Sequence, residues 1–157
     1  MKRILYAICF SIMFMALSAI KSKAQVSARP VTMPGVSNPW NDGDLLEPAD
    51  LVNAIKPGNT KPFILNIGPV ENIPGTTHIG AVSNPKNMNT LQKTLVPLPR
   101  NTAVVIYCGC CPFAKCPNIR PAFNELKKLG FTNVKVLNLT TNLKTNWIEK
   151  GYPLAKD

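Results

Sequence analysis

The fold is decided by the stretch Ala103-Val-Val-Ile-Tyr-Cys-Gly-Cys-Cys-Pro-Phe-Ala-Lys-Cys116. Its first part, residues 103–107, is a continuous apolar run, which is typical of a buried strand in a parallel sheet covered on both faces. Residues 118–129 have apolar side chains at helical spacing, and Gly130 supplies the stop, so a helix is expected there. The four cysteines therefore occupy a strand-to-helix loop. Open α/β sheets form their sites on such loops, because the following helix directs unpaired N–H groups and its positive dipole end toward them.

Working outward from this loop, strands and helices alternate along the chain. The apolar patterns predict strands at 45–46, 62–67, near 78–79 and at 133–139, and helices at 47–56, 87–95 and 143–150. This alternation predicts an α/β fold with a mainly parallel sheet.

The N-terminal residues resemble a secretory signal peptide. Basic Lys2-Arg3 precedes the apolar run 4–20, and Ser22-Lys-Ala24 offers a small-residue cleavage site. A retained membrane anchor is the alternative, because the apolar run nears the length that spans a bilayer. We expect a signal peptide at 1–24, a flexible lead-in at 25–39 and one domain at 40–157. The protein is then exported, periplasmic or secreted, with no stable membrane association after cleavage.

The charge of the chain gives little support to nucleic-acid binding. The full sequence has a net charge of +10, but four of its 18 basic residues and none of its 8 acidic residues fall within 1–24. The remaining charges are scattered and lack interleaved aromatic residues, which favours a solvated surface. A modest attraction for small anions is the more useful inference.

Several further motifs follow one another in a distinctive order along the chain. They are the run Val-Val-Ile-Tyr-Cys108, then Ala122, Leu126 and Leu129-Gly-Phe-Thr-Asn-Val134, and finally Trp147 with Lys150-Gly-Tyr-Pro153. Together with the upstream strand at 62–67 and the histidine/glycine turn at 73–81, they resemble a single rhodanese domain. The resemblance covers about residues 40–153 and is specific in the order of its motifs. It implies a five-stranded parallel sheet flanked by helices, and a catalytic cysteine that opens the loop after the central strand, which is Cys108.

The sequence departs from the family pattern at three places. The family loop usually reaches an arginine about five residues after its cysteine, whereas Arg120 lies twelve residues after Cys108. Asn66-Ile-Gly68 stands where the family often has Asp-x-Arg. Thr141-Asn142 replaces a glycine pair before the tryptophan. These departures affect the substrate assignment more than the fold.

The resemblance implies a sulfurtransferase that works through a cysteine persulfide. Cys108 would attack a sulfane sulfur as a thiolate, hold it, and pass it to a thiol or another acceptor. The loop amides, the helix N-terminus and Arg120 or Lys115 are expected to lower the pKa of Cys108. Gly109 and Asn118 complete the expected anion-binding loop. The expected substrate is a small sulfur-containing anion or a thiol, and no cofactor is expected.

The other three cysteines leave several interpretations open. Cys116, at the expected helix start, is either a resolving thiol for Cys108 or a structural bridge to Cys110 or Cys111. In the first case Cys110 and Cys111 are carriers or shields. In an oxidising compartment four cysteines allow three pairings, and a Cys108–Cys116 disulfide would mask the nucleophile.

Two rival functions use the same cysteines. Soft thiolates select Cu(I) or Zn(II), and a single crowded loop fits Cu(I) better than structural zinc, which usually draws on two separated knuckles. The rival enzyme is a thiol–disulfide oxidoreductase, which export and clustered cysteines also suit.

Overall fold

The computed structural model describes residues 37–156. The expected signal peptide and all but the last three residues of the expected lead-in lie outside the described residues. Among residues 37–156, no helix has the length and apolar character needed to cross a membrane.

The chain forms the predicted α/β fold, with a five-stranded sheet in the order β1-β5-β4-β2-β3. All four neighbouring pairs are parallel. The strands are β1 (Leu45–Leu46), β2 (Phe63–Asn66), β3 (Thr76–His78), β4 (Val104–Tyr107) and β5 (Val134–Leu137). The helices are α2 (Pro48–Ala54), α3 (Pro85–Leu95), α4 (Ile119–Lys128) and α5 (Leu143–Asn146), with 3-10 turns η1 (Asp42–Asp44), η2 (Phe113–Lys115) and η3 (Ile148–Lys150).

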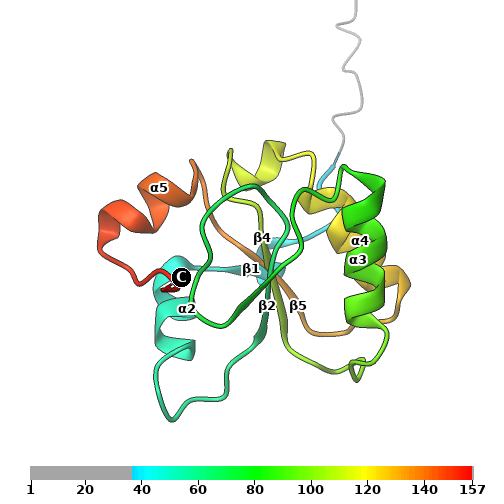
Figure 1. Cartoon of the computed structure of the whole chain (residues 1–157), viewed down its shortest axis with the longest axis horizontal. Helices are drawn as coiled ribbons and strands as arrows, with labels where there is room; N and C mark the ends of the chain where they lie inside the picture. Colours follow the sequence, from blue (N-terminus) through cyan, green and yellow to red (C-terminus); the bar gives the residue numbers. More distant parts are fainter. Residues whose placement is uncertain (1–36, 157) are drawn as a thin grey trace, which may run out of the picture. The chain divides into compact units, whose positions relative to one another are not determined.

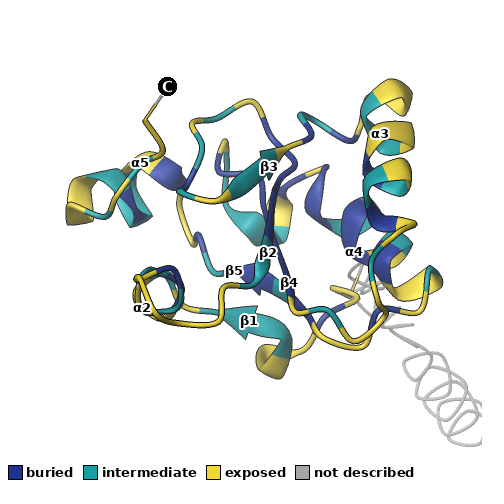
Figure 2. Cartoon of the chain, turned by 60° about the horizontal axis from the view of Figure 1, so that its bottom comes forward, coloured by how far each residue is buried: buried dark blue, intermediate teal, exposed yellow. Residues whose placement is uncertain are grey.

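Helices cover both faces of the sheet (Figures 1 and 2). Helices α3 and α4 lie over one face, where Val104 and Ile106 of β4 point. Helices α2 and α5 lie over the other, which receives Val105 and Tyr107. Because side chains alternate along a strand, a strand that is apolar at every position must be buried on both faces, as the run at 103–107 predicts.

Helix α4 is positioned by its apolar stripe and by the way it ends. Its buried residues recur at helical spacing: Ile119, Ala122, Phe123 and Leu126. At its C-terminus Gly130 N–H donates to Lys127 and Phe131 N–H to Leu126, the bonding pattern of a Schellman motif. The loop after β4 is thus held between a buried strand and a firmly packed helix.

Two tryptophans anchor the ends of the domain. Trp40 is buried and packs edge-on against Phe123, with ring centroids 5.8 Å apart. The helix predicted at 143–150 is divided into α5 and η3, because Trp147 between them leaves the helical conformation at φ −129° and ψ −61°. Its indole N–H donates to the carbonyl of Pro153, which anchors the C-terminal segment.

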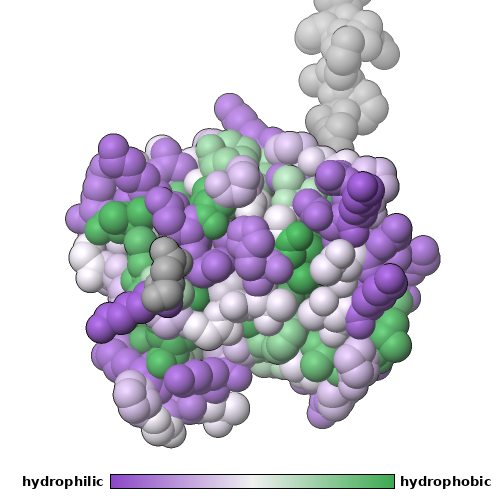
Figure 3. All heavy atoms as spheres, viewed as in Figure 1, coloured by the Kyte–Doolittle hydropathy of each residue, from purple (hydrophilic) through white to green (hydrophobic). Residues whose placement is uncertain are grey.

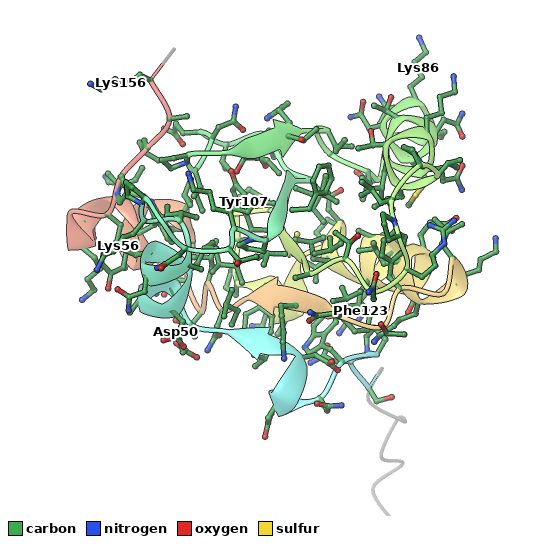
Figure 4. The ribbon with its side chains drawn as sticks, turned by 90° about the horizontal axis from the view of Figure 1, so that it is seen from below. Asp50, Lys56, Lys86, Tyr107, Phe123 and Lys156 are labelled. Carbon is green, nitrogen blue, oxygen red and sulfur yellow. The ribbon has the colours of Figure 1, made fainter. Side chains whose placement is uncertain are left out.

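Charged side chains lie at the periphery of the domain. Figure 4 shows Lys56, Lys86 and Lys156 projecting outward, whereas Tyr107 lies in the interior. On the face in Figure 3, hydrophobic side chains form separate patches among hydrophilic ones.

Candidate functional site

The cysteine loop begins where the connections of the sheet diverge. Strand β2 continues to β3 on one side, while its other neighbour β4 continues to β5 in the opposite direction. In open α/β sheets ligands bind outside the carboxyl ends of the strands at such a switch point. Gly68 follows β2 and Cys108 follows β4 at this place, so the candidate site occupies the position that the topology favours.

Gly68 allows the backbone to pass directly over Cys108. A methyl group on Gly68 would lie 2.7 Å from the Cys108 sulfur and closer still to the Cys108 carbonyl oxygen. No side chain fits there without displacement of the cysteine. The sequence interpretation noted Gly68 only as a departure from a family motif and did not identify this contact.

Three sulfur atoms gather at this point. The Sγ atoms of Cys108, Cys110 and Cys116 lie within 4.8 Å of one another. The Cys108 and Cys110 sulfurs are 3.3 Å apart, and those of Cys110 and Cys111 are 3.5 Å apart. All four are free thiols. Cys108 and Cys116 are 2% and 0% exposed, whereas Cys110 is exposed and Cys111 partly so.

Asn118 connects the start of α4 to the thiol of Cys108. Its Oδ1 accepts the backbone N–H of Ser83 at 2.9 Å, which fixes the orientation of the amide. The Nδ2 group therefore points inward and donates to the Cys108 sulfur at 3.3 Å. Asn118 is itself buried. The sequence predicted Asn118 as an anion-binding residue, and the structure places its amide on the expected nucleophile.

The structure differs from the expected ionisation at Cys108 and agrees with it at Cys116, where the helix start was expected to favour a thiolate. Cys116 faces Cys108, and this hydrogen-bonding interaction, aided by the backbone amides of Asn118 and Ile119, lowers the pKa of Cys116 to about 5 against the effect of burial. The same interaction with Cys116, together with burial, raises the pKa of Cys108, although the Asn118 amide acts the other way. Cys116 lies nearest the start of α4, where backbone N–H groups favour a thiolate. The direction of the Cys108 pKa is therefore opposite to the expected one, and the arrangement favours a thiolate on Cys116.

The outer thiols differ from the buried pair. Burial and the neighbouring Cys110 raise the pKa of Cys111 to about 12, so that side chain stays protonated.

Cys108 and Cys111 are separated by two residues and thus form a Cys-x-x-Cys, a spacing that the interpretation of the sequence overlooked. This spacing favours the alternative function of a thiol–disulfide oxidoreductase.

Gly109, Lys115 and Arg120 were also predicted to belong to the site, and they differ in burial and in their contacts. Gly109 is buried with φ +73°, and an added methyl group would meet Leu143 and Val70 within 3 Å. Lys115 is exposed on η2. Arg120 donates to the Asn38 side chain at 2.7 Å and to the Ala114 carbonyl at 3.2 Å, and its guanidinium lies 5.9 Å from the Trp40 ring. Arg120 thus ties the loop to the start of the domain, while its buried Nε has no hydrogen-bond partner among the described residues.

The loop after β2 is held by two buried polar side chains that the sequence analysis did not identify as supports. Asn66 accepts the N–H of Gly68 at 3.0 Å and donates to the carbonyl of Val70 at 2.7 Å. Tyr107 donates to the carbonyl of Glu71 and accepts the N–H of Ile73. A polar residue at the end of an apolar strand is the signal that could have identified both. Together they fix the backbone that crosses Cys108.

This arrangement is suited to sulfur chemistry or to binding a soft metal ion. It offers a buried thiol next to a thiolate, an amide donor on the same sulfur and an exposed third thiol. The only histidine, His78, is exposed, and its Nδ1 lies 3.1 Å from Asn72 Oδ1.

No protein-family model and no curated protein matches the sequence. The fold is similar to that of EanB, in a solved complex of a cysteine-to-serine variant with hercynine. The two chains are 16% identical with a TM-score of 0.52, and the match covers 71% of this chain and 27% of the EanB chain. This likeness shows the fold: an α/β domain whose parallel sheet and flanking helices are consistent with a rhodanese-like arrangement.

Proposed function

We propose that this chain is a rhodanese-like sulfurtransferase that carries sulfane sulfur as a persulfide on Cys108. The observation that supports this most is the environment of the Cys108 sulfur. It lies at the carboxyl end of the central strand, within 4.8 Å of the Cys116 sulfur and 3.3 Å from the Asn118 amide nitrogen. A nucleophile and a base within reach of each other are the usual signature of covalent catalysis.

In this mechanism Cys116 acts as the base for Cys108. Its thiolate takes the proton of Cys108 as a donor such as thiosulfate approaches, and the Asn118 amide stabilises the thiolate formed on Cys108. Cys108 then attacks the outer sulfur of thiosulfate. The sulfur–sulfur bond of the donor breaks, sulfite leaves with the bonding electron pair, and Cys108 keeps the transferred sulfur as a persulfide.

The exposed thiol of Cys110 marks the side from which substrates approach. It is 3.3 Å from the Cys108 sulfur and is the exposed member of the three-sulfur cluster. A small anion or a thiol that reaches Cys110 is therefore next to the nucleophile, provided the loop opens slightly. The net positive charge of the chain favours an anionic donor.

The test is sulfite release from thiosulfate by the reduced protein and by its Cys108→Ser variant. We expect the wild-type chain to release sulfite and the variant to release none while keeping its circular-dichroism spectrum. Cys111→Ser is the matched control, because it removes a thiol of the same loop that lies outside the three-sulfur cluster. Sulfite release by Cys108→Ser at the wild-type rate would remove Cys108 from this role.

Binding of Cu(I) is a second candidate, favoured by the three-sulfur cluster. Three thiolates around one ion at about 2.3 Å each would have their sulfurs roughly 4 Å apart. The cluster of Cys108, Cys110 and Cys116 lies within this range. Metal analysis of protein purified under reducing conditions tests this: stoichiometric, tightly bound copper supports it, and protein that loses copper to a weak chelator contradicts it.

A further inference from the structure

We propose that Cys116 resolves the Cys108 persulfide, so that the site reduces sulfane sulfur to sulfide and closes a Cys108–Cys116 disulfide. This inference rests on the proposed function, because it begins from the Cys108 persulfide. It adds the fate of the transferred sulfur, which leaves as hydrosulfide instead of passing to an external acceptor.

The two thiols are buried next to each other, which favours a reaction between them. Cys108 is 2% exposed and Cys116 is completely buried, and their sulfurs lie within 4.8 Å of each other. A persulfide on Cys108 is thus formed in contact with an internal thiol, whereas an acceptor from solution must first displace the loop. A disulfide needs its sulfurs about 2 Å apart, so the two sulfurs must approach each other by at most about 3 Å for the bond to form.

The path of the loop favours Cys116 over the other near thiol, Cys110. The loop turns back through η2, with Phe113 N–H bonded to the Leu139 carbonyl and Cys116 N–H bonded to the Phe113 carbonyl. These bonds return Cys116 to the strand end where Cys108 lies. Only Gly109 separates Cys108 from Cys110, and its backbone is confined between Leu143 and Val70. A bridge across that residue would require the backbone to move, so Cys110 is the poorer partner.

This step needs no reagent other than the Cys108 persulfide and Cys116. The proton that Cys116 took from Cys108 passes to the terminal sulfur of the persulfide. The sulfur of Cys116 attacks Cys108 Sγ, the bond between Cys108 and the terminal sulfur breaks, and hydrosulfide leaves with that electron pair. The two cysteine sulfurs are oxidised to a disulfide, and the sulfane sulfur is reduced to sulfide. Further turnover needs an external dithiol that reduces the disulfide.

The experiment is a single turnover of the full reduced chain with thiosulfate, with excess reductant removed beforehand. Sulfite and sulfide are measured separately, and disulfides are mapped by peptide mass spectrometry. We expect the wild-type chain to release equal amounts of sulfite and sulfide and to acquire a Cys108–Cys116 disulfide. Cys116→Ser also lacks the base, so it should form the Cys108 persulfide more slowly. For each sulfite released it should give at least about tenfold less sulfide than the wild-type chain while holding a Cys108 persulfide. Cys111→Ser should behave as the wild-type chain does, because Cys111 lies outside the three-sulfur cluster.

The two products distinguish the failure of this inference from the failure of the proposed function. Sulfite without sulfide from the wild-type chain, with a stable persulfide, overturns the inference and leaves the sulfurtransferase intact. Release of neither product overturns both. Sulfide release accompanied by a Cys108–Cys110 disulfide also overturns the inference. The disulfide map of the wild-type chain keeps the test decisive if Cys116→Ser does not fold.

Discussion

Asn118 is the residue through which α4 acts on the thiol of Cys108. Its amide is held by the N–H of Ser83 on one side and donates to sulfur on the other. A hydrogen bond to a charged group contributes about 1.5–3 kcal/mol. The amide therefore matters most when Cys108 is ionised, which in the proposed mechanism is at the moment of attack.

Asn118→Asp keeps the acceptor for Ser83 but replaces the donor to sulfur with a negative charge. We expect sulfite release from thiosulfate to fall between about tenfold and hundredfold, because the Cys108 thiolate loses a donor and gains a repulsive neighbour. Initial rates measured on folded protein check this. Asn84→Asp is the control: Asn84 caps α3 by accepting the N–H of Lys86, and aspartate serves equally well there. An Asn118→Asp variant as fast as the wild-type chain would contradict the assignment.

Gly68 limits the space around Cys108 from the opposite side. Gly68→Ala would press a methyl group onto the sulfur and carbonyl of Cys108. We expect a loss of about 1–3 kcal/mol in the free energy of unfolding and a larger loss in the rate of sulfite release, because the cysteine itself must move. Urea denaturation and initial rates measure the two effects. Gly43→Ala is the control, since an added methyl group there meets a single flexible side-chain oxygen, that of Asn41 at 3.0 Å. Full activity of Gly68→Ala would show that the cysteine tolerates displacement.

Strand β4 supports the site through its last residue as well as through the cysteine that follows it. The hydroxyl of Tyr107 lies 3.0 Å from the N–H of Ile73 and 3.1 Å from the carbonyl of Glu71. It is thereby the link between β4 and the loop after β2.

Tyr107→Phe removes this link and leaves the buried N–H of Ile73 without its partner. We expect the free energy of unfolding to fall by about 1–3 kcal/mol. Thermal or urea denaturation measures the change. Tyr152→Phe is the matched control, because the half-buried Tyr152 packs its ring against Trp147 and its hydroxyl lies outside this loop. Equal stability of the two variants would mean that another group satisfies the N–H of Ile73.

The elements of the fold could be predicted from the sequence because their patterns are local. The apolar run at 103–107 and the spaced apolar residues of α4 identify a strand and a helix without tertiary information. Split helices are harder: the turn at Trp147 follows from the packing of its indole against the C-terminal segment. The crowding of the thiols was also predictable, since Cys108 and Cys116 lie at the two ends of one loop.

The ionisation of the thiols and the supports of the site could not be predicted in the same way. Whether Cys108 or Cys116 carries the charge depends on which sulfur faces the amides of Asn118 and Ile119. The contact of Gly68 with Cys108 and the hydrogen bond from Arg120 to Asn38 join residues far apart in the sequence. Such contacts are set by the packing of the folded chain, so they cannot be predicted from the spacing of residues in the sequence.

The domain as a unit should respond to the redox state of its surroundings. A disulfide that includes Cys108 masks the nucleophile, and the proposed export would place the chain in an oxidising compartment. We expect protein oxidised in air to release no sulfite from thiosulfate and to recover full activity after treatment with dithiothreitol. The Cys110→Ser,Cys111→Ser double variant should behave identically, because it retains Cys108 and Cys116. Full activity of the oxidised protein, with no free Cys108 thiol, would refute redox control.

The central claim is that sulfane sulfur is held on Cys108, and the most direct measurement is the position of the added sulfur. Cys116→Ser protein, in which resolution is blocked, also lacks the proposed base, so it is exposed to thiosulfate for many wild-type turnover times. It is then alkylated and digested, and its cysteine peptides are analysed by mass spectrometry. We predict one additional sulfur atom on Cys108, and none there when Cys108 is also replaced by serine. Additional sulfur on Cys110 or Cys111 with an unmodified Cys108 would contradict the assignment of the nucleophile.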